Sequence, residues 1–265
     1  DETSSMFKNR IAGKVVLVTG ASAGIGSACA RHFAAAGCSV VLTARRVDRL
    51  EALKAELLAA HPGIHVQTVA VDMRDHAAVV ALPDALEEPV KNVDIIVNNA
   101  GLALGVDSAW DLKDEDLVTM METNVYGPFR MVKAFVPRML ARNTGHIINI
   151  SSVAGLEGYA GGSAYCASKH AIEGFGNALR ADLAATPLRV TNICPGAVET
   201  EFSVVRFAGD ADKAKNVYKG YDPMTADDIA ETVLFSANAA PNTQVATVLV
   251  LATAQYNAKG IAKKE

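Results

Sequence analysis

A tyrosine and a lysine four residues apart are the first pair in this chain that could do chemistry. Tyr165 and Lys169 lie in the segment Tyr-Cys-Ala-Ser-Lys, and Ser152 precedes the tyrosine by 13 residues. On a helix, residues four apart share a face, so the hydroxyl and the ammonium can point into one cleft. A phenol can move a proton, and a nearby ammonium lowers its ordinary pKa of about 10. For the pair taken alone, a surface tyrosine stacked on the lysine stem is the simpler interpretation.

A glycine-rich turn points to a bound phosphate. It follows the apolar run at residues 15–18 and reads Thr-Gly-Ala-Ser-Ala-Gly-Ile-Gly over residues 19–26. Glycines between a strand and a helix let the backbone approach a pyrophosphate, whose charge is met by the helix N-terminus. Tight turns need glycine for steric reasons alone, so it is the position directly after the first strand that favours nucleotide binding.

Two arginines indicate which nucleotide binds. The second predicted strand ends at Arg45 and Arg46, and the first acid after it is Asp48. An NAD site of this kind places an acid here for the ribose 2′-hydroxyl, whereas a guanidinium suits a 2′-phosphate. The sequence therefore predicts NADP as the cofactor. The alternative is an exposed basic start to a helix, which the helix dipole disfavours.

Small and polar residues follow three further predicted strands, at residues 98–101, 151–152 and 195–196. Ligands of open α/β sheets bind outside the carboxyl ends of the strands. Each group alone could be an ordinary turn, but together they describe a site at one edge of the sheet.

The elements that must position these groups alternate along the chain. Helical patterns at residues 25–36 and 46–60 lie between apolar runs, and continuous apolar character is typical of strands buried on both faces. The pattern predicts an α/β fold, a single-domain Rossmann-type doubly wound parallel sheet of about seven strands with helices on both faces. We expect an N-terminal extension over 1–13, one domain over 14–252 and a C-terminal tail over 253–265. The predicted strands are 15–18, 40–42, 66–71, 94–97, 146–150, 189–193 and 245–251.

Composition excludes several other functions. The 265 residues carry 25 basic and 29 acidic side chains and are 6% aromatic, so we expect no nucleic-acid partner. No apolar stretch reaches the about 18 residues of a membrane span, so we expect no membrane partner. The histidines and cysteines show no metal-ligand spacing, and we expect no metal. Few cysteines and no signal-peptide pattern predict a cytoplasmic protein.

Taken together, these motifs resemble the short-chain dehydrogenase/reductase family over roughly residues 13–251. The resemblance implies an oxidoreductase with a catalytic tetrad of Asn124, Ser152, Tyr165 and Lys169. In it Tyr165 moves the proton, Ser152 binds the substrate oxygen, and Asn124 anchors a water that links Lys169 to solvent. It also implies a homotetramer or homodimer. The predicted cofactor contacts are Gly20, Ser22, Ala23, Gly24, Ile25, Gly26, Arg45, Arg46, Asp72 (on the adenine side), Met73, Asn99, Ala100, Gly101, Tyr165, Lys169, Pro195, Gly196, Val198 and Thr200 (near the nicotinamide).

Three segments resemble one branch of that family, the NADP-dependent 3-hydroxy acid dehydrogenases, which act on serine and L-allo-threonine. They are residues 159–163, 195–210 and 216–219. A carboxylate substrate must be paired once water is excluded, and Arg206 is the nearest basic candidate. The predicted substrate contacts are thus Ser152, Tyr165 and Arg206. Alternatively, Arg206 pairs with Glu199, Glu201 or Asp210, or faces a partner subunit.

Two other functions stay open. One is a broad-specificity NADPH carbonyl reductase of neutral ketones and aldehydes. The other, from a different class, is a non-catalytic NADP-binding regulatory protein, which would have no need of the serine, tyrosine and lysine together.

Overall fold

The computed structural model describes residues 8–263, which form one seven-stranded parallel sheet. The strand order is β3-β2-β1-β4-β5-β6-β7. The chain moves outward from β1 to β3 and then returns to the other side of β1, so a crevice opens at the carboxyl ends of β1 and β4. The predicted doubly wound parallel sheet is confirmed. Its strands are β1 (Val15–Thr19), β2 (Ser39–Ala44), β3 (Val66–Ala70), β4 (Ile95–Asn98), β5 (His146–Ile150), β6 (Arg189–Pro195) and β7 (Thr247–Val250).

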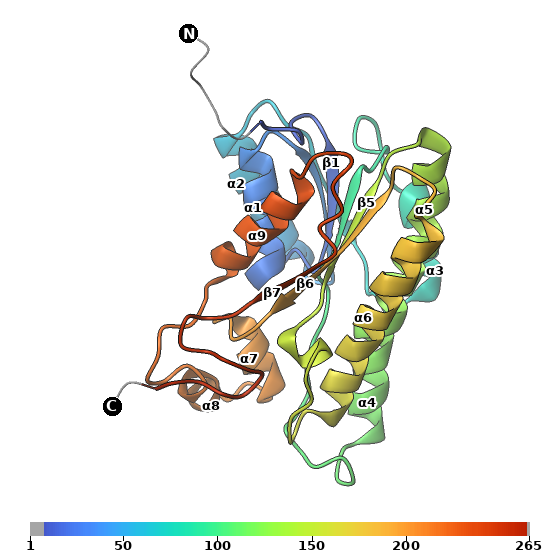
Figure 1. Ribbon diagram of the computed structural model, residues 1–265. Coiled ribbons are helices and arrows are strands. Elements are labelled where there is room, and N and C mark those ends of the chain that lie inside the picture. The colour runs from blue at the N-terminus through green and yellow to red at the C-terminus, as the bar shows by residue number, and fades with distance from the viewer. Residues whose placement is uncertain (1–7, 264–265) are drawn as a thin grey trace.

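Helices cover both faces of this sheet (Figure 1). On one face lie α1 (Gly24–Ala35), α2 (Val47–Ala60) and α9 (Ala226–Ala237). On the other lie α3 (His76–Ala81), α4 (Asp114–Met121), α5 (Gly127–Arg142) and α6 (Ser163–Asp182), with the short turns η1 (Leu82–Asp84), η2 (Glu122–Tyr126) and η3 (Val153–Gly155). Two short helices, α7 (Glu201–Arg206) and α8 (Ala211–Asn216), lie beside the C-terminal segment, beyond the layer of α1 and α9.

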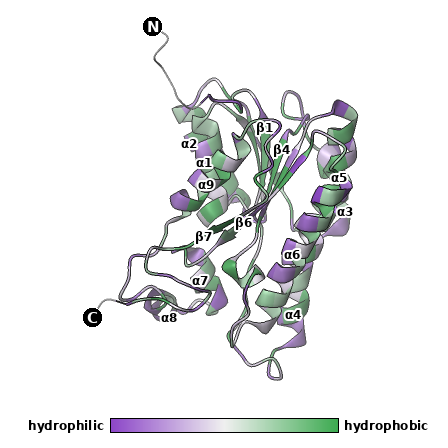
Figure 2. Cartoon of the chain, in the orientation of Figure 1, coloured by the Kyte–Doolittle hydropathy of each residue, from purple (hydrophilic) through white to green (hydrophobic). Residues whose placement is uncertain are grey.

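The core has two apolar halves, one on each face of the sheet. Alternate residues of β1 point to opposite faces: Val16 and Val18 pack with Phe33 of α1, and Leu17 packs with Met131 of α5. All five residues of β1 are buried, as a central parallel strand requires. Figure 2 shows the matching pattern, with hydrophobic residues on the strands and hydrophilic ones on the outer sides of the helices.

A row of buried amides ties three strands to α6. Asn98, Asn149 and Asn192 lie opposite one another on β4, β5 and β6. Asn98 donates to Asn149 at 2.9 Å, Asn149 to Asn192 at 3.0 Å, and Asn192 to the carboxylate of Glu173 on α6 at 3.0 Å. A one-residue slip of any strand would turn its amide to the opposite face, so the row fixes the register. It thereby holds α6, which carries Tyr165 and Lys169, in one position on the sheet.

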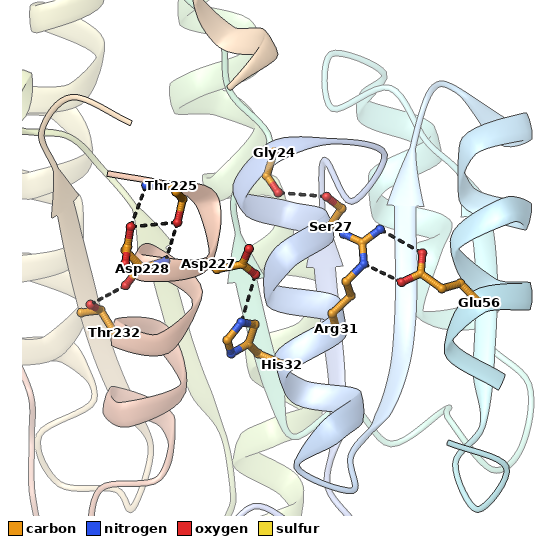
Figure 3. A network of polar contacts seen from close by, with 9 residues as sticks. All are labelled: Gly24, Ser27, Arg31, His32, Glu56, Thr225, Asp227, Asp228 and Thr232. Atoms are coloured by element: carbon orange, nitrogen blue, oxygen red, sulfur yellow. Dashed lines mark hydrogen bonds and ion pairs between the residues drawn. The ribbon is translucent and has the colours of Figure 1, made fainter. Parts of the chain in front are cut away.

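Polar pairs also join the three helices of the opposite face (Figure 3). Arg31 of α1 donates to both oxygens of Glu56 on α2, and His32 of α1 lies 3.1 Å from the carboxylate of Asp227 on α9. The Arg31–Glu56 pair is exposed and the His32–Asp227 pair is partly exposed, so each contributes little stability. Their effect is to hold α1 between its two neighbours, with its N-terminus at the crevice.

Within residues 8–263, no helix is long and apolar enough to cross a membrane. The same residues contain no group of three or more His, Cys, Asp or Glu side chains placed to hold a metal ion.

Candidate active site

A cavity of about 340 Å³ lies at the carboxyl ends of the strands, where the crevice was expected. Its walls come from the turn after β1, the ends of β2 to β6, α6 and α7. The predicted cofactor and catalytic residues line this cavity, with two exceptions, Gly26 and Asn124. Arg206, the third residue absent from the lining, borders a second cavity of about 10 Å³ next to Tyr165.

The glycine-rich turn needs its glycines for close packing. A Cβ at Gly26 would lie 2.5 Å from the carbonyl oxygen of Gly20, so this glycine packs behind the turn instead of lining the cavity. Gly24 has φ +53° and faces Thr200. The N-cap of α1, Ala23, has no side chain able to accept from the first backbone N–H groups of the helix. Those donors at the cavity wall fit an anionic group such as a pyrophosphate.

The arginines after β2 make a cationic end of the cavity. Arg46 donates through Nε and Nη2 to the hydroxyl of Ser22 and through Nη1 to the carboxylate of Glu201 at 3.0 Å. Arg45 is exposed beside Asp72 and helps to lower the pKa of that carboxyl. A hydroxyl and two guanidinium groups are donors that suit a phosphate monoester, so the residues present fit NADP.

Asp72 and Met73 follow β3 and line the same end of the cavity. Arg74 donates from its backbone and its side chain to Asp72, and this bonding holds the pKa of the Asp72 carboxyl below its ordinary value. The carbonyl of Met73 accepts from Arg130 of α5 at 3.1 Å. The loop that was expected near the adenine is therefore fixed by two arginines.

Ser152, Tyr165 and Lys169 meet at the other end of the cavity. Lys169 is buried, donates to the carbonyl of Ile150 at 2.9 Å, and has its ammonium 5.8 Å from the centroid of the Tyr165 ring. Ser152 accepts from the amide of Ala154 and donates to the carbonyl of Pro195 at 3.4 Å. The sequence placed Ser152 on one segment and Tyr165 with Lys169 on another, and the fold brings all three to one wall.

Burial is the main cause of the pKa shifts of Tyr165 and Lys169. It raises the pKa of Tyr165 above its ordinary value, while the Ser152 hydroxyl and the charge of Arg206 lower it. Burial lowers the pKa of Lys169 to about 8, against the opposing effect of Cys194 and Glu173. The lysine was expected to lower the Tyr165 pKa, but burial raises that pKa, and the groups that oppose the rise are Ser152 and Arg206. The phenol is protonated at neutral pH and is ready to give its proton to an oxygen.

Asn124 lies behind this wall, in the π-helical turn η2 between α4 and α5. Its Oδ1 accepts from the backbone of Leu102 at 2.9 Å, and its Nδ2 donates to the Leu102 carbonyl at 2.8 Å and to Ser168 at 3.1 Å. The side chain joins the loop after β4 to α6 and leaves Leu102, not itself, in the cavity wall. A π-helical turn at this point is in keeping with the frequent occurrence of such turns at functional sites.

Arg206, at the end of α7, binds only neutral groups among the described residues. It donates to Tyr159 Oη at 3.1 Å and to the carbonyls of Gly105 at 3.3 Å and Gly161 at 3.1 Å. The alternative in which it pairs with Glu199, Glu201 or Asp210 is wrong, because Glu201 pairs with Arg46 and Arg49, and Asp210 caps α8 and pairs with Lys213. Its charge therefore remains available beside Tyr165.

Sequence reasoning missed several residues of the site. Phe202 and Val205 on α7 add an apolar wall, and the Phe202 ring lies 5.6 Å from that of Tyr165. Gln255 is buried after β7 and accepts from the amide of Ala197 at 2.8 Å. The only signal for the first two was their place in the segment after β6, and Gln255 belongs to no motif. The remaining unpredicted lining residues are Thr43, Ala44, Val71, Leu102, Thr123, Ile150 and Glu201.

Comparisons with known proteins agree with this geometry. A family model described as short chain dehydrogenase matches residues 14–210. The chain is 41% identical over 258 residues to the NADP-dependent 3-hydroxy acid dehydrogenase of Schizosaccharomyces pombe, covering 97% of this chain and 99% of that protein. It is 44% identical over 242 residues to a Salmonella typhi protein of the same name, covering 91% and 96%. A solved structure of the closed form of a serine dehydrogenase complexed with NADP+ superposes with TM-score 0.88 at 40% identity, covering 95% of this chain and all of that one.

Proposed function

We propose that this chain, which belongs to the short-chain dehydrogenase/reductase family, transfers a hydride between NADP and the 3-hydroxyl or 3-keto group of short 3-hydroxy acids. The observation that carries the proposal is a single cavity with arginines at one end and Ser152, Tyr165 and Lys169 at the other. The related NADP-dependent 3-hydroxy acid dehydrogenases and the serine dehydrogenase structure support it.

The side chains of the site have distinct tasks in this reaction. When bound, NADP accepts the hydride in the oxidation and, in its reduced form, donates it in the reduction. Ser152 binds and orients the substrate oxygen. In reduction, Tyr165 gives its proton to that oxygen as the carbonyl becomes an alcohol, and in oxidation it takes the hydroxyl proton. Lys169, fixed on the carbonyl of Ile150, holds a charge near the ring, which stabilises the tyrosinate that remains after proton transfer.

The substrate class is proposed from the charge of Arg206. This guanidinium is bound by a phenol and two backbone carbonyls, none of which neutralises it. A substrate carboxylate beside Tyr165 would do so and would gain a charge-assisted hydrogen bond. Serine and L-allo-threonine are short 3-hydroxy acids with the required carboxylate.

One observation favours a second candidate. Leu102, Phe202 and Val205 give the cavity an apolar wall near Tyr165, which suits a neutral ketone or aldehyde. The test compares serine, L-allo-threonine and neutral alcohols of similar size, each with NADP and NAD. A higher kcat/KM for the acids supports the proposal, and a higher value for the neutral substrates supports a broad carbonyl reductase. Binding of NADP without turnover of any of them would make the protein a non-catalytic NADP-binding one.

We propose further that the protein is a homo-oligomer, a dimer or tetramer, in the cytoplasm. Trp110, Val118 and Tyr126 are exposed around α4 and η2, and Phe129 stacks on Phe175 at the surface of α5 and α6. Exposed aromatic and apolar side chains gathered in one region are typical of subunit interfaces. The four cysteines are free and buried, which is consistent with a reducing compartment. Light scattering measures the oligomeric state directly.

A further inference from the structure

Glu201 of α7 contacts two arginines, Arg46 at the N-cap of α2 and Arg49 within α2. Its carboxylate accepts from Arg46 at 3.0 Å and from Arg49 at 2.8 and 2.9 Å. Arg46 also donates twice to Ser22, and Ser22, Arg46 and Glu201 all line the cavity. The carboxylate of Glu201 is therefore already bound to the guanidinium of Arg46, which faces the phosphate-binding end of the site.

We propose that Glu201 is a specificity-determining residue for the dinucleotide, because its carboxylate and a ribose 2′-phosphate compete for Arg46. The inference rests on the proposed NADP function. The Glu201 carboxylate already accepts a hydrogen bond from Arg46 Nη1. It must give up this bond when a 2′-phosphate accepts from the same nitrogen. A dinucleotide without the 2′-phosphate requires no such exchange. Glu201 therefore weakens the binding of the 2′-phosphorylated dinucleotide only.

Replacing the Arg46–Glu201 bond by a bond to the phosphate costs little free energy. The side chains of Arg46 and Glu201 are 44% and 50% exposed, and exposed ion pairs are weak. Arg49 binds both oxygens of Glu201 through a single nitrogen, so the carboxylate keeps a cationic partner after Arg46 is released. Glu201 thus stays close to the subsite and opposes the binding of a second anion by charge repulsion.

A positioning role for Glu201 would predict the opposite change in phosphate affinity. If Glu201 serves to hold Arg46 in the orientation that a phosphate needs, removing its charge would loosen Arg46 and weaken phosphate binding. Competition and positioning therefore differ in the sign of one measurement.

The experiment measures the binding of 2′,5′-ADP and of 5′-AMP to the full chain by calorimetry, for the wild type and Glu201→Gln. Competition predicts that Glu201→Gln binds 2′,5′-ADP about fivefold more tightly at low salt, with the 5′-AMP affinity unchanged and the gain reduced at high salt. In an Arg46→Met background the same substitution should give a smaller gain. Tighter binding of both ligands alike, no change for either, or weaker binding of 2′,5′-ADP would overturn the proposal.

Glu56→Gln is the matched control. Glu56 also accepts two hydrogen bonds from an arginine, Arg31 (Figure 3), and its side chain is also 50% exposed, but it does not line the cavity. We expect it to leave both affinities unchanged. The wild type tests the proposed cofactor separately, because equal affinity for 2′,5′-ADP and 5′-AMP there would contradict the NADP assignment whatever Glu201 does.

Discussion

The guanidinium of Arg206 donates a hydrogen bond to the phenol of Tyr159 at 3.1 Å and lies 5.5 Å from the centroid of its ring. The ring and two backbone carbonyls fix the arginine without neutralising it, and its charge opposes the rise in the pKa of Tyr165 that burial causes. The fold thus holds a positive charge beside the residue proposed to move the proton. An anionic substrate is the simplest partner for such a charge.

Arg206→Met tests this relationship. Hydrogen bonds to charged groups contribute about 1.5–3 kcal/mol, so we expect the KM for serine to rise by about tenfold or more. The KM for a neutral alcohol of similar size should change little. Arg138→Met, at an exposed arginine that pairs with Asp84 on the surface, is the control and should affect neither substrate. An equal loss on both substrates would remove Arg206 from the substrate site.

Tyr165→Phe removes only the hydroxyl. We expect kcat to fall by about 10²–10⁴, the usual contribution of a general acid or base, while the fold and NADP binding persist. Steady-state kinetics and calorimetry measure the two effects. Tyr256→Phe is a suitable control, because Tyr256 is 71% exposed and does not line the cavity. Near-normal turnover in Tyr165→Phe would mean that another group supplies the proton.

Arg45→Asp should move the cofactor preference toward NAD. We expect the unmodified protein to favour NADP by about tenfold or more, since charge-assisted hydrogen bonds contribute about 1.5–3 kcal/mol each. An acid at residue 45 repels the 2′-phosphate and can accept from the 2′-hydroxyl of NAD. The ratio of kcat/KM for the two cofactors reports the change. Equal efficiency with both in the unmodified protein would refute the arginine assignment.

His146 makes stability depend on pH. It is buried on β5, and burial lowers its pKa well below the ordinary 6.5. Thr191 donates its hydroxyl to Val245 at 2.6 Å, so the His146 Nε2–H must donate to Thr191, which leaves Nδ1 buried without a hydrogen-bond partner among residues 8–263. Below pH 6.5 the unfolded chain binds a proton that the folded protein does not. The free energy of unfolding therefore decreases as the pH is lowered, by up to about 1.4 kcal/mol per pH unit.

Urea unfolding between pH 5 and pH 8 measures this dependence. His146→Gln retains a side-chain N–H for Thr191 but does not titrate, so its stability should fall less below pH 6.5 than that of the wild type. His65→Gln, at an exposed histidine, is the control and should follow the wild type. The same decline in His146→Gln as in the wild type would show that other groups cause it.

The fold could be predicted because its signals are local. Each apolar run became a strand of the sheet to within a few residues, and the predicted 146–150 strand is β5. Most of the predicted site residues lie at strand ends and helix starts, where a motif fixes position, whereas Asn124 lies in η2 and Arg206 at the end of α7. Contacts that depend on how distant loops meet could not be predicted. Arg206 binds carbonyls 101 and 45 residues away, and Glu201 lies 155 residues from Arg46.

The bond between Gln255 and the amide of Ala197 lets the segment after β7 support the loop that lines the cavity at Gly196 and Val198, although the matched family model ends at residue 210. A Cβ at Gly196 would lie 2.1 Å from the Gln255 oxygen, so the two segments interlock. Chimeras that exchange the segment after β7 among relatives would therefore alter the support of the loop at residues 195–196 as well. We expect substrate range and cofactor affinity to change together in such chimeras, whereas the single substitutions Arg45→Asp and Arg206→Met are each expected to change one of them.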